Sequence, residues 1–118
     1  MSEHFDRYME GWATGDVEML LSACAEDFVL DDAIDGRFTK AELPAYFESL
    51  GDGVVKITDV VAEEVGGLET AWCWWSLEVP TGTALVSQEG ASLAKVGSDG
   101  VHWQKVTYYA REPHIVPR

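Results

Sequence analysis

The stretch that decides the fold is "VVKITDVVAEEVGGLETAWCWWSLEVPTGTALVSQEGASLAKVGSDGVHWQKVTYYAR", residues 54–111. Apolar and polar residues alternate along it, and the short turns "GG", "PTG" and "GSDG" divide it into four runs. Alternation is the pattern of strands, and short glycine-containing turns join antiparallel neighbours. The stretch therefore predicts four long strands in a sequential antiparallel meander, which we expect to curl around the first half of the chain.

Apolar residues in the first half recur with helical spacing. Three sets do so: Phe5, Tyr8, Met9 and Trp12; Val17, Leu20, Leu21 and Cys24; Leu43, Tyr46, Phe47 and Leu50. Gly15 is suited to end the first helix and Asp16 to cap the second. "TKAE", residues 39–42, has the form of a capping box and predicts a third helix starting near Thr39. A brief strand is expected over "AEDFVL", residues 25–30.

Length and charge narrow the range of functions. The chain has 118 residues, which predicts one domain spanning residues 1–118. The net charge of −13 argues against binding to nucleic acid or to an anionic membrane, because both need clustered lysines and arginines. No apolar run approaches the length of a membrane span.

The two cysteines bear on metal binding and on localisation. Cys24 and Cys73 lie far apart and form no CxxC or Cys/His motif, so we expect no structural zinc. The acidic N-terminus does not resemble a secretory leader, and together these features predict a reduced, cytoplasmic protein.

The second strand of the meander is apolar on both faces. By alternation, Trp72 and Trp74 point to one side, while Cys73, Trp75 and Leu77 point to the other. One face is expected to meet the helices. The other is expected to meet a second copy of the chain, which predicts a homodimer.

A family resemblance is carried by "YMEGWATGDVEMLLSACAEDFVLDD", residues 8–32, by "GRFTKAELPAYFESL", residues 36–50, and by the meander that follows. The chain resembles the nuclear-transport-factor-2-like superfamily, and within it the SnoaL-like group of polyketide cyclase and ketosteroid isomerase relatives. The resemblance implies a cone-shaped α+β fold, in which three N-terminal helices pack on a strongly curved antiparallel sheet and enclose a pocket. It further implies a small hydrophobic ligand, no cofactor and frequent dimers.

The resemblance also supplies candidate catalytic residues. Asp32 occupies the place of the isomerase's proton-shuttling aspartate, where burial would raise its pKa, and Tyr8 the place of its oxyanion-stabilising tyrosine. The alternatives are that Asp32 caps a turn and that Tyr8 is a core residue. The isomerase's second oxyanion donor, an acid, has no clear equivalent among residues 91–93, and Ala110 stands where many relatives have an acid.

Two functions remain open at this stage. One is a cofactor-free acid/base enzyme acting on a small hydrophobic carbonyl compound. The other is a non-catalytic ligand-binding or dimerisation module. In both, the expected pocket walls are Trp12, Phe28, Phe47, Trp72, Trp74, His102, Gln104 and Tyr108.

The acidic stretch "FVLDDAIDG", residues 28–36, begins a partial match to a calcium-binding loop. Asp31, Asp35, Gly36 and Glu42 match four positions of an EF-hand loop. Ala33, however, supplies no side-chain oxygen at the third position, and Glu42 is needed by the capping box. We therefore predict no metal site.

Overall fold

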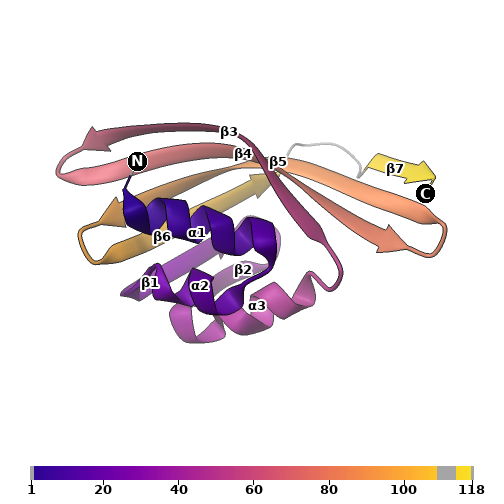
Figure 1. The fold of residues 1–118 in the computed structure, drawn as a ribbon, viewed down its shortest axis with the longest axis horizontal. Helices are drawn as coiled ribbons and strands as arrows, with labels where there is room; N and C mark the ends of the chain where they lie inside the picture. Colours follow the sequence, from indigo (N-terminus) through magenta and orange to yellow (C-terminus); the bar gives the residue numbers. More distant parts are fainter. Residues whose placement is uncertain (1, 109–113, 118) are drawn as a thin grey trace.

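A seven-stranded sheet carries three helices on one of its faces (Figure 1). The computed structural model describes residues 2–108 and 114–117. The helices are α1 (Glu3–Thr14), α2 (Val17–Ser22) and α3 (Leu43–Ser49), with a 3-10 turn (Lys40–Glu42) before α3. The strands are β1 (Cys24–Asp32), β2 (Gly36–Thr39), β3 (Val54–Val65), β4 (Leu68–Thr81), β5 (Ala84–Gly97), β6 (Gly100–Tyr108) and β7 (His114–Pro117). The predicted α+β class is confirmed.

The helix boundaries follow from local capping. Gly15 ends α1 in a left-handed conformation, with φ of 76°, and the Asp16 side chain accepts a hydrogen bond from the backbone of Met19 at the start of α2. The capping box at Thr39 is present, but it opens the 3-10 turn. The third helix therefore begins at Leu43, later than predicted, with Pro44 in its first turn, where a missing N–H is tolerated.

The sheet order is β2-β1-β6-β5-β4-β3, with β7 paired to β5. Strands β3 to β6 form the predicted antiparallel meander. The sequence did not reveal that β1 pairs parallel with β6, that β2 pairs with β1, or that β7 pairs with β5. The first half of the chain thus contributes β1 and β2 to the sheet, and its helices pack over that same sheet.

Helices α1 and α2 approach closely at Gly11. A Cβ atom at this position would lie 2.9 Å from the backbone nitrogen of Leu20, so glycine is needed there. Phe5, Leu20, Phe28, Leu30 and Leu43 are almost fully buried between helices and sheet. Among the described residues, no helix has the length and apolar character needed to cross a membrane.

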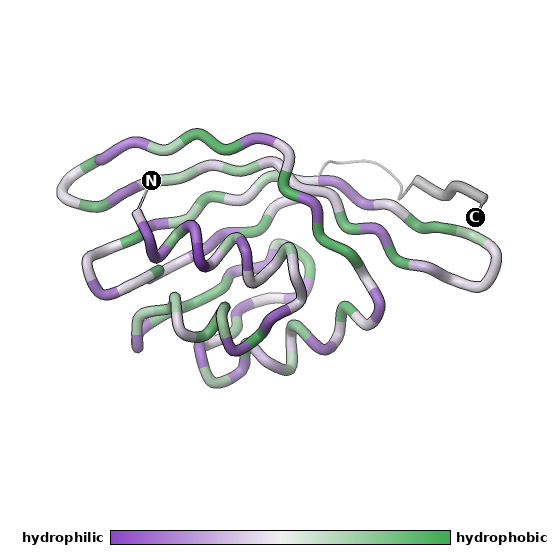
Figure 2. Tube along the Cα trace, viewed as in Figure 1, coloured by the Kyte–Doolittle hydropathy of each residue, from purple (hydrophilic) through white to green (hydrophobic). Residues whose placement is uncertain are grey.

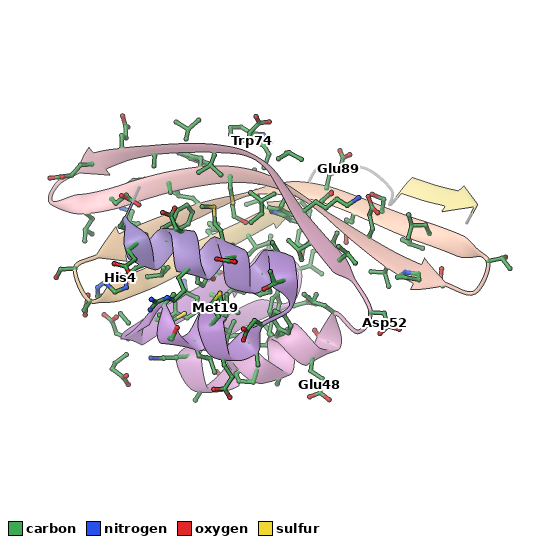
Figure 3. The ribbon with its side chains drawn as sticks, viewed as in Figure 1. His4, Met19, Glu48, Asp52, Trp74 and Glu89 are labelled. Atoms are coloured by element: carbon green, nitrogen blue, oxygen red, sulfur yellow. The ribbon has the colours of Figure 1, made fainter. Side chains whose placement is uncertain are left out.

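Strand β4 presents different residues to the two sides of the sheet. Cys73 is buried and Trp75 partly buried on the side of the helices, whereas Trp72 and Trp74 are 46% and 37% exposed. Trp74 points away from the helices (Figure 3). The prediction that Trp72 and Trp74 line the pocket is therefore wrong, because the face of β4 that meets the helices is the face with Cys73 and Trp75.

Apolar residues recur along the strands, including the part of the sheet on which the helices pack (Figure 2). Apolar residues also continue along the β4–β5 hairpin beyond the helices. The long axis measures 46 Å, against 25 and 23 Å for the other two. The core is thus concentrated where the helices cross the sheet, and the functional site is sought there.

Candidate functional site

A cavity of about 70 Å³ lies between the helices and the inner face of the sheet. Its wall is formed by Phe5, Tyr8, Met9, Trp12, Leu30, Tyr46, Leu50, Val55, Ile57, Cys73, Trp75, Leu77, Ser92, Ala94, Gln104, Val106 and Tyr108. Of the residues that the structure describes, none in this wall is Asp, Glu, Lys, Arg or His. Aromatic and aliphatic walls with few polar groups are typical of small-molecule sites.

Trp12 organises the helical side of the cavity. Its indole meets Tyr8 and Tyr46 edge-on, with ring centroids 6.2 and 6.0 Å apart, and stacks on Phe47 at 5.3 Å. Edge-to-face and offset arrangements at these distances are the favourable ones for aromatic pairs. Trp12 thus joins α1 to α3 across the cavity.

Trp75 and Tyr108 form the opposite wall, at the same level of the sheet. Trp75 pairs with Gly90 across β4 and β5, and Gly90 pairs with Tyr108 across β5 and β6. A Cβ atom on Gly90 would lie 2.4 Å from the Trp75 ring, so the glycine leaves the space that the indole occupies. The Trp75 and Tyr108 rings are nearly perpendicular, with centroids 5.2 Å apart.

Asp32 lies behind this wall, 2% exposed, at the end of β1. Its Oδ2 accepts hydrogen bonds from the hydroxyls of Tyr46 and Tyr108, both at 2.6 Å. Its Oδ1 accepts from the backbone N–H groups of Ile34 and Asp35, at 2.8 and 3.0 Å, which is the geometry of a side-chain-stabilised turn. The carboxylate therefore holds its own turn, α3 and β6 together.

Hydrogen bonding decides the protonation of Asp32. Burial acts to raise its pKa, but the bonds from Tyr108, Tyr46 and the two backbone N–H groups together act more strongly, so the pKa lies below its ordinary value. Burial and the neighbouring carboxylate raise the pKa values of Tyr46 and Tyr108. The expectation of a raised pKa at Asp32 is wrong, because it took burial into account and omitted the four donors.

Tyr8 is buried in the cavity wall and does not contact Asp32. Its hydroxyl donates a hydrogen bond to Oε1 of Gln104, on β6. Burial raises the pKa of Tyr8 well above its ordinary value. The side chain of Trp12 acts in the opposite direction, although its Nε1 forms no hydrogen bond of ordinary geometry with a described residue. The two predicted catalytic residues thus lie in separate hydrogen-bonded groups.

Three buried polar atoms of wall residues have no hydrogen-bond partner among residues 2–108 and 114–117. They are Nε1 of Trp12, Nε1 of Trp75 and Oγ of Ser92. Trp12 comes from α1, Trp75 from β4 and Ser92, 2% exposed, from β5. Buried polar groups are nearly always paired, so three unpaired ones in the wall of one cavity call for an explanation.

The predicted pocket residues divide into two groups. Trp12, Gln104 and Tyr108 lie in the wall, as does Tyr8. Phe28 is buried in the core behind Tyr8, with ring centroids 5.8 Å apart, and Phe47 lies behind Trp12. The assignment of Phe28 and Phe47 to this wall is corrected, because other aromatic rings separate them from it.

His102 also lies outside the cavity. Its ring nitrogens bond Asp27 and Asp99 at 2.6 and 2.5 Å, at the end of the molecule where β5 turns into β6. The assignment of His102 to the pocket is therefore wrong, because these carboxylates hold the ring at the surface. They raise its pKa, against the opposing effect of burial. Ala110 lies outside the described residues.

The acidic stretch supplies no cluster for a metal. Among residues 2–108 and 114–117, no three His, Cys, Asp or Glu side chains gather in a way that could hold a metal ion. Asp31 Oδ2 forms an ion pair with Nε of Arg37 at 3.7 Å, and Glu42 Oε1 accepts a hydrogen bond from the backbone N–H of Thr39 at 3.0 Å. Two members of the EF-hand pattern are therefore engaged in other contacts.

Sequence reasoning missed Tyr46, Trp75 and Ser92. Tyr46 was noted as part of an apolar helical stripe, and that stripe does not show which of its members carries a hydroxyl to a buried acid. Alternation places Trp75 on the opposite face from Trp72, but the prediction assigned the pocket to the face with Trp72 and Trp74. Cys73, which shares a face with Trp75 and is of a residue type that is usually buried, was the available signal that their face is the inner one.

The comparisons with known proteins agree with this fold. A SnoaL-like domain model matches residues 5–105, and the chain belongs to the SnoaL-like domain family. The predicted resemblance and the cone-shaped fold are confirmed. A comparison with curated proteins finds no significant relative.

Three solved structures illustrate the likeness. A protein of unknown function with a cystatin-like fold from Methylobium petroleophilum PM1 shares 12% identity over 97% of this chain and 82% of its own, with a TM-score of 0.74. A candidate polyketide cyclase from Pseudomonas putida KT2440 shares 16% over 92% and 90%, with a TM-score of 0.71. A hypothetical protein with a ketosteroid isomerase-like fold from Catenulispora acidiphila, in complex with trimethylamine, shares 15% over 93% and 88%, at 0.71. At these identities the likeness shows the fold alone.

Proposed function

We propose that the protein binds a small, mostly apolar molecule that carries a hydrogen-bond-accepting oxygen, in the cavity between helices and sheet. The observation that carries this proposal is the set of unpaired polar atoms on Trp12, Trp75 and Ser92. Each of these buried atoms lacks a partner in the described part of the chain, at a cost of about 1–3 kcal/mol. A ligand oxygen would accept from these donors and recover part of that cost.

The rest of the wall fits the same ligand. It is mainly aromatic and aliphatic, and its titratable members stay neutral near pH 7, because burial raises the pKa of Cys73 to about 11 and those of the tyrosines above their ordinary value. The cavity is small, so a ligand larger than a few heavy atoms would need side chains to move. The Catenulispora protein, whose fold is similar and whose structure contains trimethylamine, supports the proposal of a small ligand.

The experiment makes the same alanine-to-leucine substitution once on each face of β5. Ala94 is buried in the cavity wall, whereas Ala91 points to the opposite face. A set of small oxygen-bearing compounds is screened by thermal shift against the wild type, Ala94→Leu and Ala91→Leu. We expect hits that stabilise the wild type and Ala91→Leu but not Ala94→Leu, because leucine fills the cavity.

The opposite pattern would contradict the proposal. Hits retained by Ala94→Leu would place the binding elsewhere, and the absence of any hit would remove its support. If Ala94→Leu fails to fold, Ser92→Ala takes its place. It removes one donor and should weaken binding about tenfold, the effect of one lost hydrogen bond.

A second candidate is the cofactor-free acid/base enzyme, with Asp32 as base and Tyr8 as donor. It is favoured by one contact: Tyr46 and Tyr108, whose hydroxyls bond Asp32, both line the cavity. The low pKa of Asp32 makes it a weak base, which is why binding is placed first. Turnover of a carbonyl compound from the screen tests the enzyme. If Asp32 is the catalytic base, Asp32→Asn should lower the turnover rate about a hundredfold. Unchanged turnover would exclude this role.

We also propose that the predicted homodimer forms through the outer face of the sheet. Val61, Trp72 and Leu93 lie side by side there, across β3, β4 and β5. The acids Asp59 and Glu63 lie on the β3 side of these apolar residues, and the bases Lys95 and Lys105 on the β5 and β6 side. A two-fold axis through the tryptophans would place acids opposite bases.

Light scattering coupled to gel filtration tests this dimer. A dimeric mass is expected for the wild type and a monomeric mass for Trp72→Glu, because a charge at the centre of an apolar contact is costly. Glu64→Gln, near the end of β3, is the control and should stay dimeric. A monomeric wild type across the micromolar range would overturn the proposal.

A further inference from the structure

The cavity wall contains an unusual density of aromatic rings. They belong to Phe5, Tyr8, Trp12, Tyr46, Trp75 and Tyr108. The rings are held in place by one another, since Trp12 packs edge-on against Tyr8 and Tyr46, and Trp75 against Tyr108. Aromatic rings carry negative charge on their faces, and groups of them around a small space are the way in which proteins bind organic cations.

A buried negative charge lies directly behind two of these rings. Asp32 is 2% exposed, and its low pKa keeps it ionised near pH 7. Across residues 2–108, no Lys, Arg or His forms an ion pair with it. Its hydrogen bonds from the hydroxyls of Tyr46 and Tyr108 draw the hydroxyl protons away from the cavity. Both phenol oxygens therefore turn lone pairs, not protons, towards whatever lies beside them.

These features favour one sign of ligand charge. A buried carboxylate without a counter-ion leaves a negative potential in its surroundings, and a cation nearby would compensate it. Among the described residues, the cavity wall supplies no cation, and the chain as a whole carries a net charge of −13. An anionic ligand would meet this potential with no compensating group from the described part of the wall.

From the aromatic wall and the uncompensated Asp32 we infer that the ligand is a small alkylammonium cation that also carries an oxygen. The cationic end would lie against the rings near Tyr46 and Tyr108, and the oxygen would accept from the unpaired donors of Trp12, Trp75 or Ser92. This inference rests on the proposed function, because it names the ligand class of the same cavity.

The test compares two molecules that differ only in charge. Choline carries a quaternary ammonium and a hydroxyl, and 3,3-dimethylbutan-1-ol has the same shape with a carbon in place of the nitrogen. Binding is followed by NMR at the indole N–H signals, assigned with Trp12→Phe and Trp75→Phe. The signals of the outward-facing Trp72 and Trp74 serve as internal controls for binding outside the cavity.

We expect choline to shift the Trp12 and Trp75 signals and to bind about tenfold or more tightly than the neutral alcohol, the effect of one desolvated cation–π contact. Asp32→Asn should abolish most of this preference. Asp31→Asn is the matched control: it removes one charge from the neighbouring residue, whose carboxylate faces Arg37 instead of the cavity wall, and should keep the preference.

The possible outcomes separate the two proposals. Equal binding of both molecules, or tighter binding of the alcohol, overturns the cation and leaves the proposed function standing. No shift with choline also overturns it, and the compound screen then decides the proposed function by itself. If Asp32→Asn does not fold, the comparison of the two molecules in the wild type still decides, because it needs no variant.

Discussion

The two faces of strand β4 have similar compositions and different roles. Trp72 and Trp74 leave the sheet on the side away from the helices and are partly exposed, whereas Trp75 turns inward, next to Tyr108, with Gly90 leaving space for its ring. Figure 1 makes the cause visible, since all three helices lie on one side of the sheet. Burial is thus decided by which face the helices cover, and tryptophan itself carries no information about that choice.

The largest expected effect contrasts two tryptophan truncations. Trp75→Ala should lower the free energy of unfolding by about 3–5 kcal/mol, because it removes a packed ring beside the cavity. Trp72→Ala, examined at low protein concentration to avoid the proposed dimer, should lower it by less than about 1 kcal/mol. Urea denaturation followed by circular dichroism measures both. Equal losses would mean that the two faces are not distinguished as described.

A similar contrast concerns two adjacent carboxylates. Asp32→Asn should lower the free energy of unfolding by about 2–4 kcal/mol, because an amide group would replace an acceptor of two tyrosine hydroxyls. Asp31→Asn should cost less than about 1 kcal/mol, because its contact with Arg37 is near the surface. The same denaturation measurement checks both variants, and a costly Asp31→Asn would contradict the placement of these two side chains.

The stability profile at acid pH follows from Asp32. Its pKa is lower in the folded protein than in the unfolded chain, so its contribution is fully present above the unfolded value of about 4 and is lost as pH falls through the folded pKa. Wild-type stability should therefore decline below about pH 4. The decline should be shallower in Asp32→Asn, and thermal melts between pH 2 and 6 would show it. Parallel profiles for the two proteins would argue against an ionised Asp32.

The smallest effect is expected at His102, near the surface. Its bonds to Asp27 and Asp99 raise its pKa in the folded protein. Its contribution is therefore present below the unfolded pKa of about 6.5 and is lost as pH rises through the folded value. His102→Gln should remove this loss at pH values above about 6.5, with thermal melts as the measurement. An unchanged wild-type slope in the variant would mean that the ring is not held by the two carboxylates.

Much of the fold could be predicted from the sequence. The glycine-containing turns place the boundaries of β3 to β6, and Gly15 with Asp16 separates α1 from α2, because these signals act within a few residues. The parallel pairing of β1 with β6 leaves no such local mark. Cys24 pairs with Val101 and Asp32 with Val106, across a separation that no turn residue reports.

The site was predictable in part for the same reason. Trp12, Gln104 and Tyr108 were expected in the pocket wall and Tyr8 as a catalytic donor, and all four side chains line the cavity. The hydrogen bonds that set the chemistry of Asp32 come from α3, β6 and its own turn, and they depend on how these elements meet. A sequence gives the identity of Asp32 but not the four donors that lower its pKa and occupy its oxygens.

The central claim is that the inner cavity is a binding site whose polar groups await a ligand. A crystal structure of the purified protein, with attention to density in the cavity, tests it most directly. The account predicts a bound molecule with an atom about 3 Å from Nε1 of Trp75 or Oγ of Ser92. A structure in which Trp12, Trp75 and Ser92 all bond other protein groups, with the cavity closed, would contradict it.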